Sequence, residues 1–203
     1  MRNTGKKLGP RTKPPEERRD ELMNAAQQLF LKHGVTETSI EQITTAARVA
    51  KGTFYLYFWS KEDVLGALGE RFGQAHLAYI KAAIAKKSDK SWKEKLATWA
   101  KACASGYLDS IQLHDVVFYG PRPRRREGLV DNIVIDHLAE LLEAGGKARA
   151  WSMQDSRTSA VFLFSGLHAI VDDAYSKEKR VNRVRLRRRL EQLFFRAVGL
   201  TSR

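Results

Sequence analysis

Residues 38–61, with the sequence TSIEQITTAARVAKGTFYLYFWSK, constrain the fold of this chain more than any other stretch. Thr38 and Ser39 are good helix N-cap residues, and each has a glutamate or glutamine three places on, so either can close a capping box. Apolar residues then recur at the spacing of one helix face. The stretch therefore predicts two short helices joined by a tight turn at about 48–50, with the second helix running from 51 to 58.

The second of these helices has two different faces. Phe54 and Phe58 are four residues apart, so they share one face and can anchor the helix to a core. The other face carries a glycine, which lets a backbone approach closely, and hydroxyl groups that can reach phosphate oxygens. Leucine or threonine methyl groups there can contact the methyl group of thymine. Such a face suits a DNA groove.

The segment VAKGTFYLYFWSKEDVL resembles the recognition-helix signature of the TetR family of bacterial transcription regulators, and ITTAARVAKG resembles the turn that leads into it. The resemblance covers roughly residues 15–68. The family usually has Gly where this chain has Arg48, and often Ser where it has Ala50. A left-handed residue at the first position favours Gly, so strain is expected at Arg48, which could instead add a phosphate contact. The second departure removes a hydroxyl that could cap the recognition helix.

The resemblance also implies which residues lie at the DNA. By position in the matched motif these are Lys51, Gly52, Thr53, Tyr55, Leu56 and Tyr57. Ser39 and Lys61 are implied to hold phosphates. The implied assembly is a homodimer on double-stranded DNA, at a palindromic operator whose half-sites lie about one helical turn apart, roughly 34–36 Å.

Composition agrees with an anionic partner. The 203 residues carry a formal net charge of +13, which favours nucleic acid, and 43% hydrophobic content is enough for a sizeable core. The single cysteine, Cys103, excludes an internal disulfide and fits a reducing cytoplasm. No run approaches the roughly 18 apolar residues of a membrane span, and no secretory signal is expected. We expect a cytoplasmic bacterial protein, at the nucleoid when bound to DNA.

The rest of the chain predicts helices only, without strand pattern or internal repeat, so the fold class is all-α with about nine helices. Residues 1–13 read as a flexible basic arm that follows the phosphate backbone or enters the minor groove, or else as a solvated tail. Residues 14–62 form the predicted three-helix, helix-turn-helix DNA-binding domain. Residues 63–203 form the predicted effector-binding and dimerisation domain. Its helices are expected at about 60–85, from 91, at 110–119, 128–144, 154–175 and 181–198.

The last two predicted helices suit a four-helix bundle across a two-fold axis, which the resemblance also implies. Helix 154–175 is nearly hydrophobic all round, so it should be buried on most sides. Helix 181–198 carries one apolar stripe. The predicted dimer interface consists of Phe162, Gly166, Ile170, Leu186, Leu190, Leu193 and Phe194.

An effector pocket is implied by the resemblance, although no pocket residue can be carried over by motif. The candidates are Trp99, Cys103, Tyr107, Phe118, Phe162 and His168, which alternatively fill the core. No cofactor and no metal are predicted. His168 and Asp172 could hold a metal only if His76 or His114 came near, and a hydrogen-bonded histidine is the alternative.

Two arginine runs have two possible interpretations. They form a solvated face, or they bind an anionic effector such as an acyl thioester of coenzyme A. They comprise Arg122 with residues 124–126, and the arginines within 180–189.

Motifs of enzymes are missing from the sequence, so no enzyme is predicted. The chain is predicted to be a sequence-specific transcriptional regulator, a repressor released from its operator by a small-molecule effector. One alternative is a small-molecule-binding helical protein whose helix-turn-helix domain has lost its affinity for DNA. The other is a broad DNA-coating regulator without a single operator.

Overall fold

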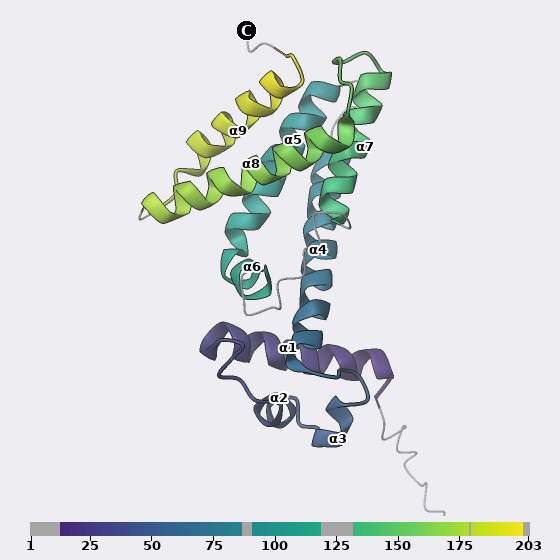
Figure 1. The fold of residues 1–203 in the computed structure, drawn as a ribbon, viewed down its shortest axis with the longest axis vertical. Helices are drawn as coiled ribbons and strands as arrows, with labels where there is room; N and C mark the ends of the chain where they lie inside the picture. The colour runs from purple at the N-terminus through teal and green to yellow at the C-terminus, as the bar shows by residue number, and fades with distance from the viewer. Residues whose placement is uncertain (1–12, 87–90, 119–131, 179, 201–203) are drawn as a thin grey trace, which may run out of the picture. The chain divides into compact units, whose positions relative to one another are not determined.

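The computed structural model describes residues 13–86, 91–118, 132–178 and 180–200. The predicted arm, the arginines at 122–126 and the expected start of a helix at 128 lie outside these ranges. The described residues are all-α, as predicted, and contain no strand (Figure 1). The helices are α1 Pro15–His33, α2 Ile40–Ala46, α3 Lys51–Phe54, α4 Lys61–Ala85, α5 Trp92–Asp109, α6 Ile111–Phe118, α7 Ile133–Lys147, α8 Ser156–Lys177 and α9 Arg183–Ala197.

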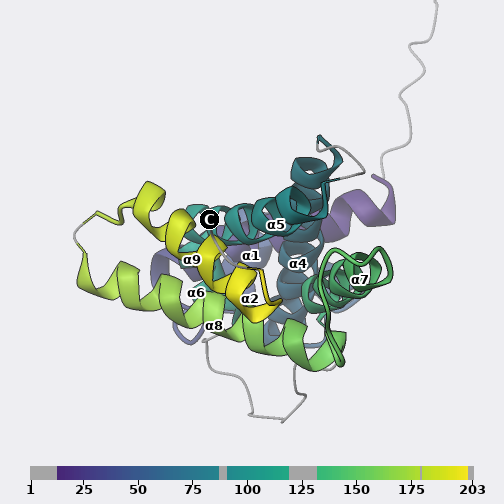
Figure 2. The same cartoon turned by 90° about the horizontal axis from the view of Figure 1, so that it is seen from above.

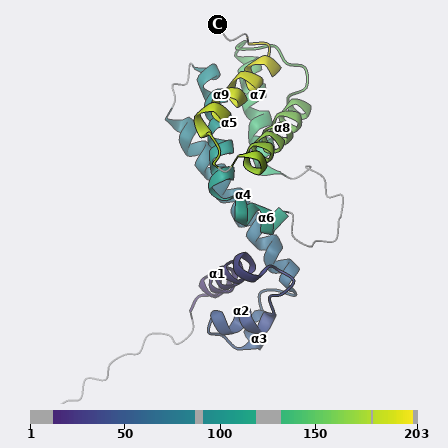
Figure 3. The ribbon, with the colours of Figure 1, turned by 90° about the vertical axis from the view of Figure 1, so that its left-hand side faces the viewer.

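The chain forms two compact units. One comprises Met1–Gly69 and Asp115–Arg122, and the other comprises Glu70–His114 and Pro123–Arg203. In the first unit α2 contacts both α1 and α3, and the three helices lie together (Figure 3). In the second unit α5 contacts α7, α8 and α9 and is therefore central to the core.

Local signals in the sequence explain where the helices of the first unit begin and end. Pro15 occupies the first turn of α1, where a missing N–H costs nothing. Gly34 ends α1 with φ of +81°, a conformation that favours glycine. Of the two N-cap candidates, Ser39 closes the capping box with Gln42. Thr38 is buried instead, and its hydroxyl donates to the carbonyl oxygen of Gly34 at 2.7 Å.

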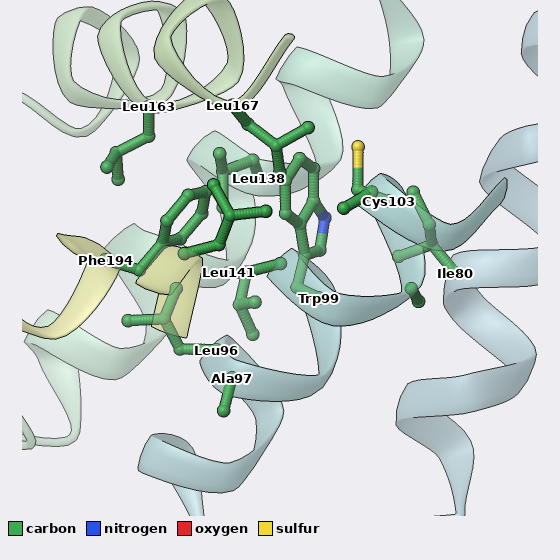
Figure 4. Close-up of a cluster of buried hydrophobic side chains, with 14 of the residues drawn as sticks. Ile80, Leu96, Ala97, Trp99, Cys103, Leu138, Leu141, Leu163, Leu167 and Phe194 are labelled. Atoms are coloured by element: carbon green, nitrogen blue, oxygen red, sulfur yellow. The ribbon is translucent and has the colours of Figure 1, made fainter. Parts of the chain in front are cut away.

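The core of the second unit is built around Trp99 (Figure 4). Its ring stacks on that of Phe194, from α9, with centroids 6.0 Å apart, and its indole N–H donates to His137 Nδ1 at 3.2 Å. Leu138 and Leu167 complete this cluster from α7 and α8, and both are fully buried. Burial of so large an apolar set is the main stabilising contribution to this unit.

The sequence also predicts that Ser91 caps α5 in a capping box with Glu94 and that Gly145–Gly146 ends α7, and both of these expectations are wrong. Ser91 makes no side-chain cap at the start of α5. Helix α7 does not end at the Gly145–Gly146 pair but continues to Lys147. Gly145 is needed inside the helix, because a Cβ there would lie 2.0 Å from the ring of Trp151. Within the single chain α8 buries one face, and Phe162 is 72% exposed, so burial of its other faces by a partner stays a prediction.

Candidate functional site

The predicted recognition helix is shorter than expected. Instead of 51–58, α3 spans Lys51–Phe54, and the following turn is closed by bonds from the N–H of Tyr57 and of Phe58 to the carbonyl oxygen of Phe54, each at 3.0 Å. The predicted anchor face is nevertheless present. Phe54 and Phe58 are 0% and 2% exposed, with ring centroids 5.8 Å apart. Two buried rings therefore hold the segment that follows α2.

The opposite side of this segment faces outward. Tyr55 is 50% and Leu56 79% exposed, and Lys51 and Gly52 are exposed as well. Space around Gly52 is open, because a Cβ built there meets no atom within 4 Å. Thr53 and Tyr57 are half-buried at the edges of this surface. We call residues 51–57 the reading segment.

The sequence reasoning missed Trp59, which is 86% exposed directly after the reading segment. Its backbone N–H donates to a carboxylate oxygen of Asp63 at 3.0 Å, and Ser60 Oγ accepts from the N–H of Asp63 at 3.2 Å. Ser60, with Asp63 three places on, is the N-cap that the sequence predicts for this helix, and the bond between them confirms it. The sequence does contain a signal for this exposure. Trp59 directly precedes the capping residue Ser60 and does not share the four-residue spacing of the buried Phe54 and Phe58.

The expected strain at Arg48 is present in the backbone. Its φ is +55°, in the left-handed region, where most side chains other than glycine are disfavoured. The turn holds this conformation through bonds from the N–H of Arg48 to Thr45 O at 3.1 Å and from that of Val49 to Thr44 O at 2.9 Å. The phosphate contact of Arg48 stays a prediction.

The two residues implied to hold phosphates have local partners. Ser39 Oγ accepts from the N–H of Gln42 at 3.1 Å, a bond that does not use its own hydrogen. The ammonium group of Lys61 donates to the carbonyl oxygens of Val35, Thr36 and Thr38 at 2.7, 3.0 and 2.6 Å. These bonds use all three N–H donors of the ammonium group. A phosphate contact by Lys61 would require at least one of them to be released.

We therefore expect Lys61 to stabilise the fold of the first unit and not to contact a phosphate. Lys61→Met keeps the length of the side chain and removes the donors. It should lower the free energy of unfolding by about 1–3 kcal/mol, because three carbonyls lose a charged partner. The slope of log affinity against log salt on random DNA should stay unchanged, whereas loss of a phosphate contact reduces it by about one. Denaturant unfolding and anisotropy titrations measure the two quantities. Unchanged stability with a smaller slope would favour the phosphate role.

The six candidate pocket residues do not form one group. Trp99 and Cys103 are fully buried in the core described above, and burial raises the pKa of the Cys103 thiol. Phe118 is 43% and Phe162 72% exposed. The remaining two, Tyr107 and His168, do come together, as described below.

Tyr107 and His168 have ring centroids 4.6 Å apart, and Tyr107 Oη donates to an oxygen of Asp172 at 2.5 Å. His76 and His114 are buried near them, and burial lowers the pKa of His76 to about 4 and that of His114 to about 3, with neighbouring histidine charge as a smaller cause. Within the described ranges, no group of three or more potential ligand side chains is arranged to hold a metal. At neutral pH these rings are uncharged.

The predicted dimer residues fall into two groups. Leu186, Leu190 and Phe194 are 5%, 0% and 1% exposed within the single chain, so they pack its own core and offer no surface. They form the buried face of α9, which the sequence cannot assign to a core or to a partner. The rest of the set is partly or fully exposed: Phe162, Gly166, Ile170 and Leu193. Helices α8 and α9, which carry these residues, lie against each other (Figure 2).

The arginines of α9 are mostly on its exposed side. Arg183 pairs with Asp109 at 2.5 Å, and Arg187 donates to Ser105 Oγ at 3.1 Å. A hollow of about 610 Å³ beside the first turn is lined by Arg180 and Arg183 among others. In the part of the chain that the structure describes, no helix is both long and apolar enough to span a membrane.

Comparison with known proteins agrees with the geometry of the first unit. Residues 22–68 match the family model "Bacterial regulatory proteins, tetR family". The HTH-type transcriptional regulator HbdR of Aromatoleum sp. (strain CIB) is 44% identical over 50 residues, which are 25% of this chain and 22% of that protein. Five curated relatives, all regulators, match over only 22% to 35% of their own length.

Solved structures match over almost the whole chain. The fatty acid degradation regulator FadR from Bacillus halodurans is 27% identical, with a TM-score of 0.70, over 98% of this chain and 100% of that one. FadR from Bacillus subtilis, solved in complex with stearoyl-CoA, is 24% identical, with a TM-score of 0.69, over 90% of this chain and 99% of that one. The motif at residues 22–68 is therefore that of the TetR family of bacterial regulatory proteins, and the all-helical fold of the chain is similar to that of the two FadR regulators.

Proposed function

We propose that this chain is a homodimeric repressor of transcription that binds a palindromic operator and is released by a small-molecule effector. The observation that carries the proposal is the reading segment: two buried phenylalanines fix it, while Tyr55 and Leu56 face outward at 50% and 79% exposure. Exposed apolar side chains that are neighbours, here together with Trp59, mark a surface that binds a partner. As a regulator it works in the cytoplasm, on the nucleoid.

Each part of the reading segment has a role in this proposal. Lys51 supplies positive charge at the start of α3, and Gly52 allows close approach to the groove. The hydroxyl groups of Thr53, Tyr55 and Tyr57 reach phosphates or base edges, and Leu56 contacts a thymine methyl group. The net charge of +13 draws the protein to DNA of any sequence.

Release by an effector needs only a modest free energy. An effector that binds one conformation of the dimer better than the DNA-bound one shifts the population by its difference in affinity, and a few kcal/mol suffices. That FadR of Bacillus subtilis, which has this fold, was solved in complex with stearoyl-CoA supports a small-molecule ligand for this chain. The ligand of this chain is not assigned by that similarity.

Selection from random double-stranded DNA tests the proposal. We expect enrichment of a palindrome whose half-sites are centred about one helical turn apart, protected as one short footprint. The affinity for this site should exceed that for random DNA by about 10³-fold or more at physiological salt. Footprints that extend without limit would instead identify a DNA-coating regulator. Absence of any retained DNA would favour a small-molecule-binding protein.

A further inference from the structure

Four helices of the second unit bring imidazole and aromatic rings to one place. The ring of Tyr107, on α5, has its centroid 4.3 Å from that of His114 on α6 and 4.6 Å from that of His168 on α8. On α4, Phe72 stacks on His76 with centroids 5.8 Å apart, and it meets His114 edge-on at 5.8 Å. Three of the five histidines of the chain therefore meet here. We call His76, Tyr107, His114 and His168 the histidine cluster.

His76 is the member whose position packing alone does not explain. It is only 9% exposed, and among the described residues its Nε2 atom has no hydrogen-bond partner. Buried polar atoms are nearly always paired, and an unpaired one destabilises the fold. The ring fits only because position 106 is glycine, since a Cβ there would lie 2.8 Å from His76 Cε1 and Nδ1. A glycine on α5 thus makes room for a polar ring that an apolar side chain would replace more favourably.

The histidine cluster carries no positive charge at neutral pH. Burial lowers the pKa of His76, His114 and His168, most strongly for the first two. Asp172 on α8 is a charged group beside them: its oxygen accepts from Tyr107 Oη, and its charge acts against the lowering of the pKa of His168. His168 Nδ1 lies 3.0 Å from the carbonyl oxygen of Phe164, which can only accept, so Nδ1 carries the hydrogen and Nε2 is an acceptor.

We propose that the histidine cluster is the polar end of the effector site of this protein and that the effector is an uncharged aromatic compound with a hydroxyl group. The inference rests on the proposed function, because it assigns a ligand to the unit that would respond to one. The hydroxyl group pairs with His76 Nε2. The ring of the effector lies among the aromatic side chains Phe72, Tyr107 and Phe164.

The chemistry of the histidine cluster selects this class. Among the described residues, the charges that act on the three histidines are those of the histidines themselves and of Asp172, so a buried carboxylate or phosphate there would have no compensating cation, which is costly. A purely apolar ring would leave His76 Nε2 unpaired. A hydroxyl group both donates and accepts, so it can satisfy a neutral imidazole in either tautomer. Flat rings around the site favour an aromatic body through edge and stacking contacts.

Three probes of nearly equal shape test the assignment on the full-length protein. Phenol carries the hydroxyl group, toluene lacks it, and benzoate replaces it with a charge. By calorimetry or ligand-observed NMR, phenol should bind at least about tenfold more tightly than either of the others, as expected for a hydrogen bond to a buried group. Phenol should also shift the side-chain nitrogen resonances of His76. Equal binding of phenol and toluene, or no binding of phenol, would overturn the inference.

His76→Phe is the decisive variant, with His137→Phe as its matched control. The first removes the nitrogen but keeps a flat ring, so it should abolish the preference for phenol over toluene while leaving the melting temperature equal or higher. The second removes the acceptor of the Trp99 indole N–H, so it should lower stability and keep the preference. Should His76→Phe not fold, Gly106→Ala displaces the same ring and is expected to weaken phenol binding equally. Undiminished preference in the folded variant contradicts the proposal.

Operator binding by the same preparations separates this inference from the proposed function. His76 is not part of the reading segment, so ligand-free His76→Phe should bind the selected palindrome like the wild type. Operator binding without a preference for phenol would overturn the inference alone. Loss of sequence-specific DNA binding by the wild-type protein would instead overturn the proposed function.

Discussion

Gly52→Leu is expected to weaken operator binding by about a hundredfold or more while leaving the protein folded and dimeric. A Cβ at this exposed position meets no protein atom within 4 Å, so a leucine there has open space in the free protein. Leucine also favours a helix over glycine by up to about 1 kcal/mol, so stability should not fall. On DNA the same side chain stands between α3 and the groove, and a hundredfold loss corresponds to about 2.7 kcal/mol.

Fluorescence anisotropy with the selected palindrome, at one fixed salt concentration, measures this loss, and thermal unfolding checks the fold. Gly146→Leu is the matched control, because position 146 is a second helical glycine with open space around it, on α7 in the other unit. The control should bind DNA like the wild type. Wild-type affinity in Gly52→Leu would show that this face of the reading segment does not enter the groove.

Phe162→Asp is expected to convert the protein to a monomer and thereby remove most of its operator affinity. The side chain is 72% exposed in the single chain, so a charge there costs the protomer little. In an apolar interface the same carboxylate would be buried without a partner, which is strongly unfavourable. We expect the dimer dissociation constant to rise by about a hundredfold or more, equivalent to at least about 2.7 kcal/mol. The affinity for the operator that comes from linking two DNA-binding domains in one dimer is then lost.

Sedimentation equilibrium gives the dimer constant, and the anisotropy assay gives the affinity for DNA. Val184→Asp is the matched control: Val184 is 68% exposed on α9 and is not among the predicted interface residues. It should remain dimeric. A Phe162→Asp protein that stays dimeric would remove Phe162 and the exposed face of α8 from the interface, and attention would move to other surfaces of the second unit.

Features that depend on residues close together in the chain could be predicted from the sequence. The capping box at Ser39, the N-cap at Ser60, the anchor spacing of Phe54 and Phe58, and the left-handed residue at Arg48 each involve residues no more than four apart. At such separations the backbone geometry of a helix or turn determines which residues are in contact. The all-α class and the position of the reading segment therefore followed from local patterns.

Features that depend on packing between helices could not be predicted from the sequence. The sequence could not show that Lys61 reaches back to carbonyls at residues 35–38, or that Gly145 inside α7 makes room for Trp151. It predicted α9 leucines at a dimer interface, whereas Leu186 and Leu190 fill the core of their own chain. An apolar stripe specifies that a face is covered but not by what, because burial is not directional.

The sequence by itself determined an all-helical fold with a TetR-type motif and an outward-facing segment at 51–57, since periodicity, caps and anchor spacing are properties of short stretches. Only the tertiary structure decided that His114 and His168 meet at Tyr107 and that His76 joins them through Phe72, as α4, α5, α6 and α8 converge there. Residue types alone do not encode that convergence, because each helix could bury its histidine elsewhere. The proposed operator contacts thus rest on local sequence, and the proposed effector site rests on the packing of the carboxy-terminal unit.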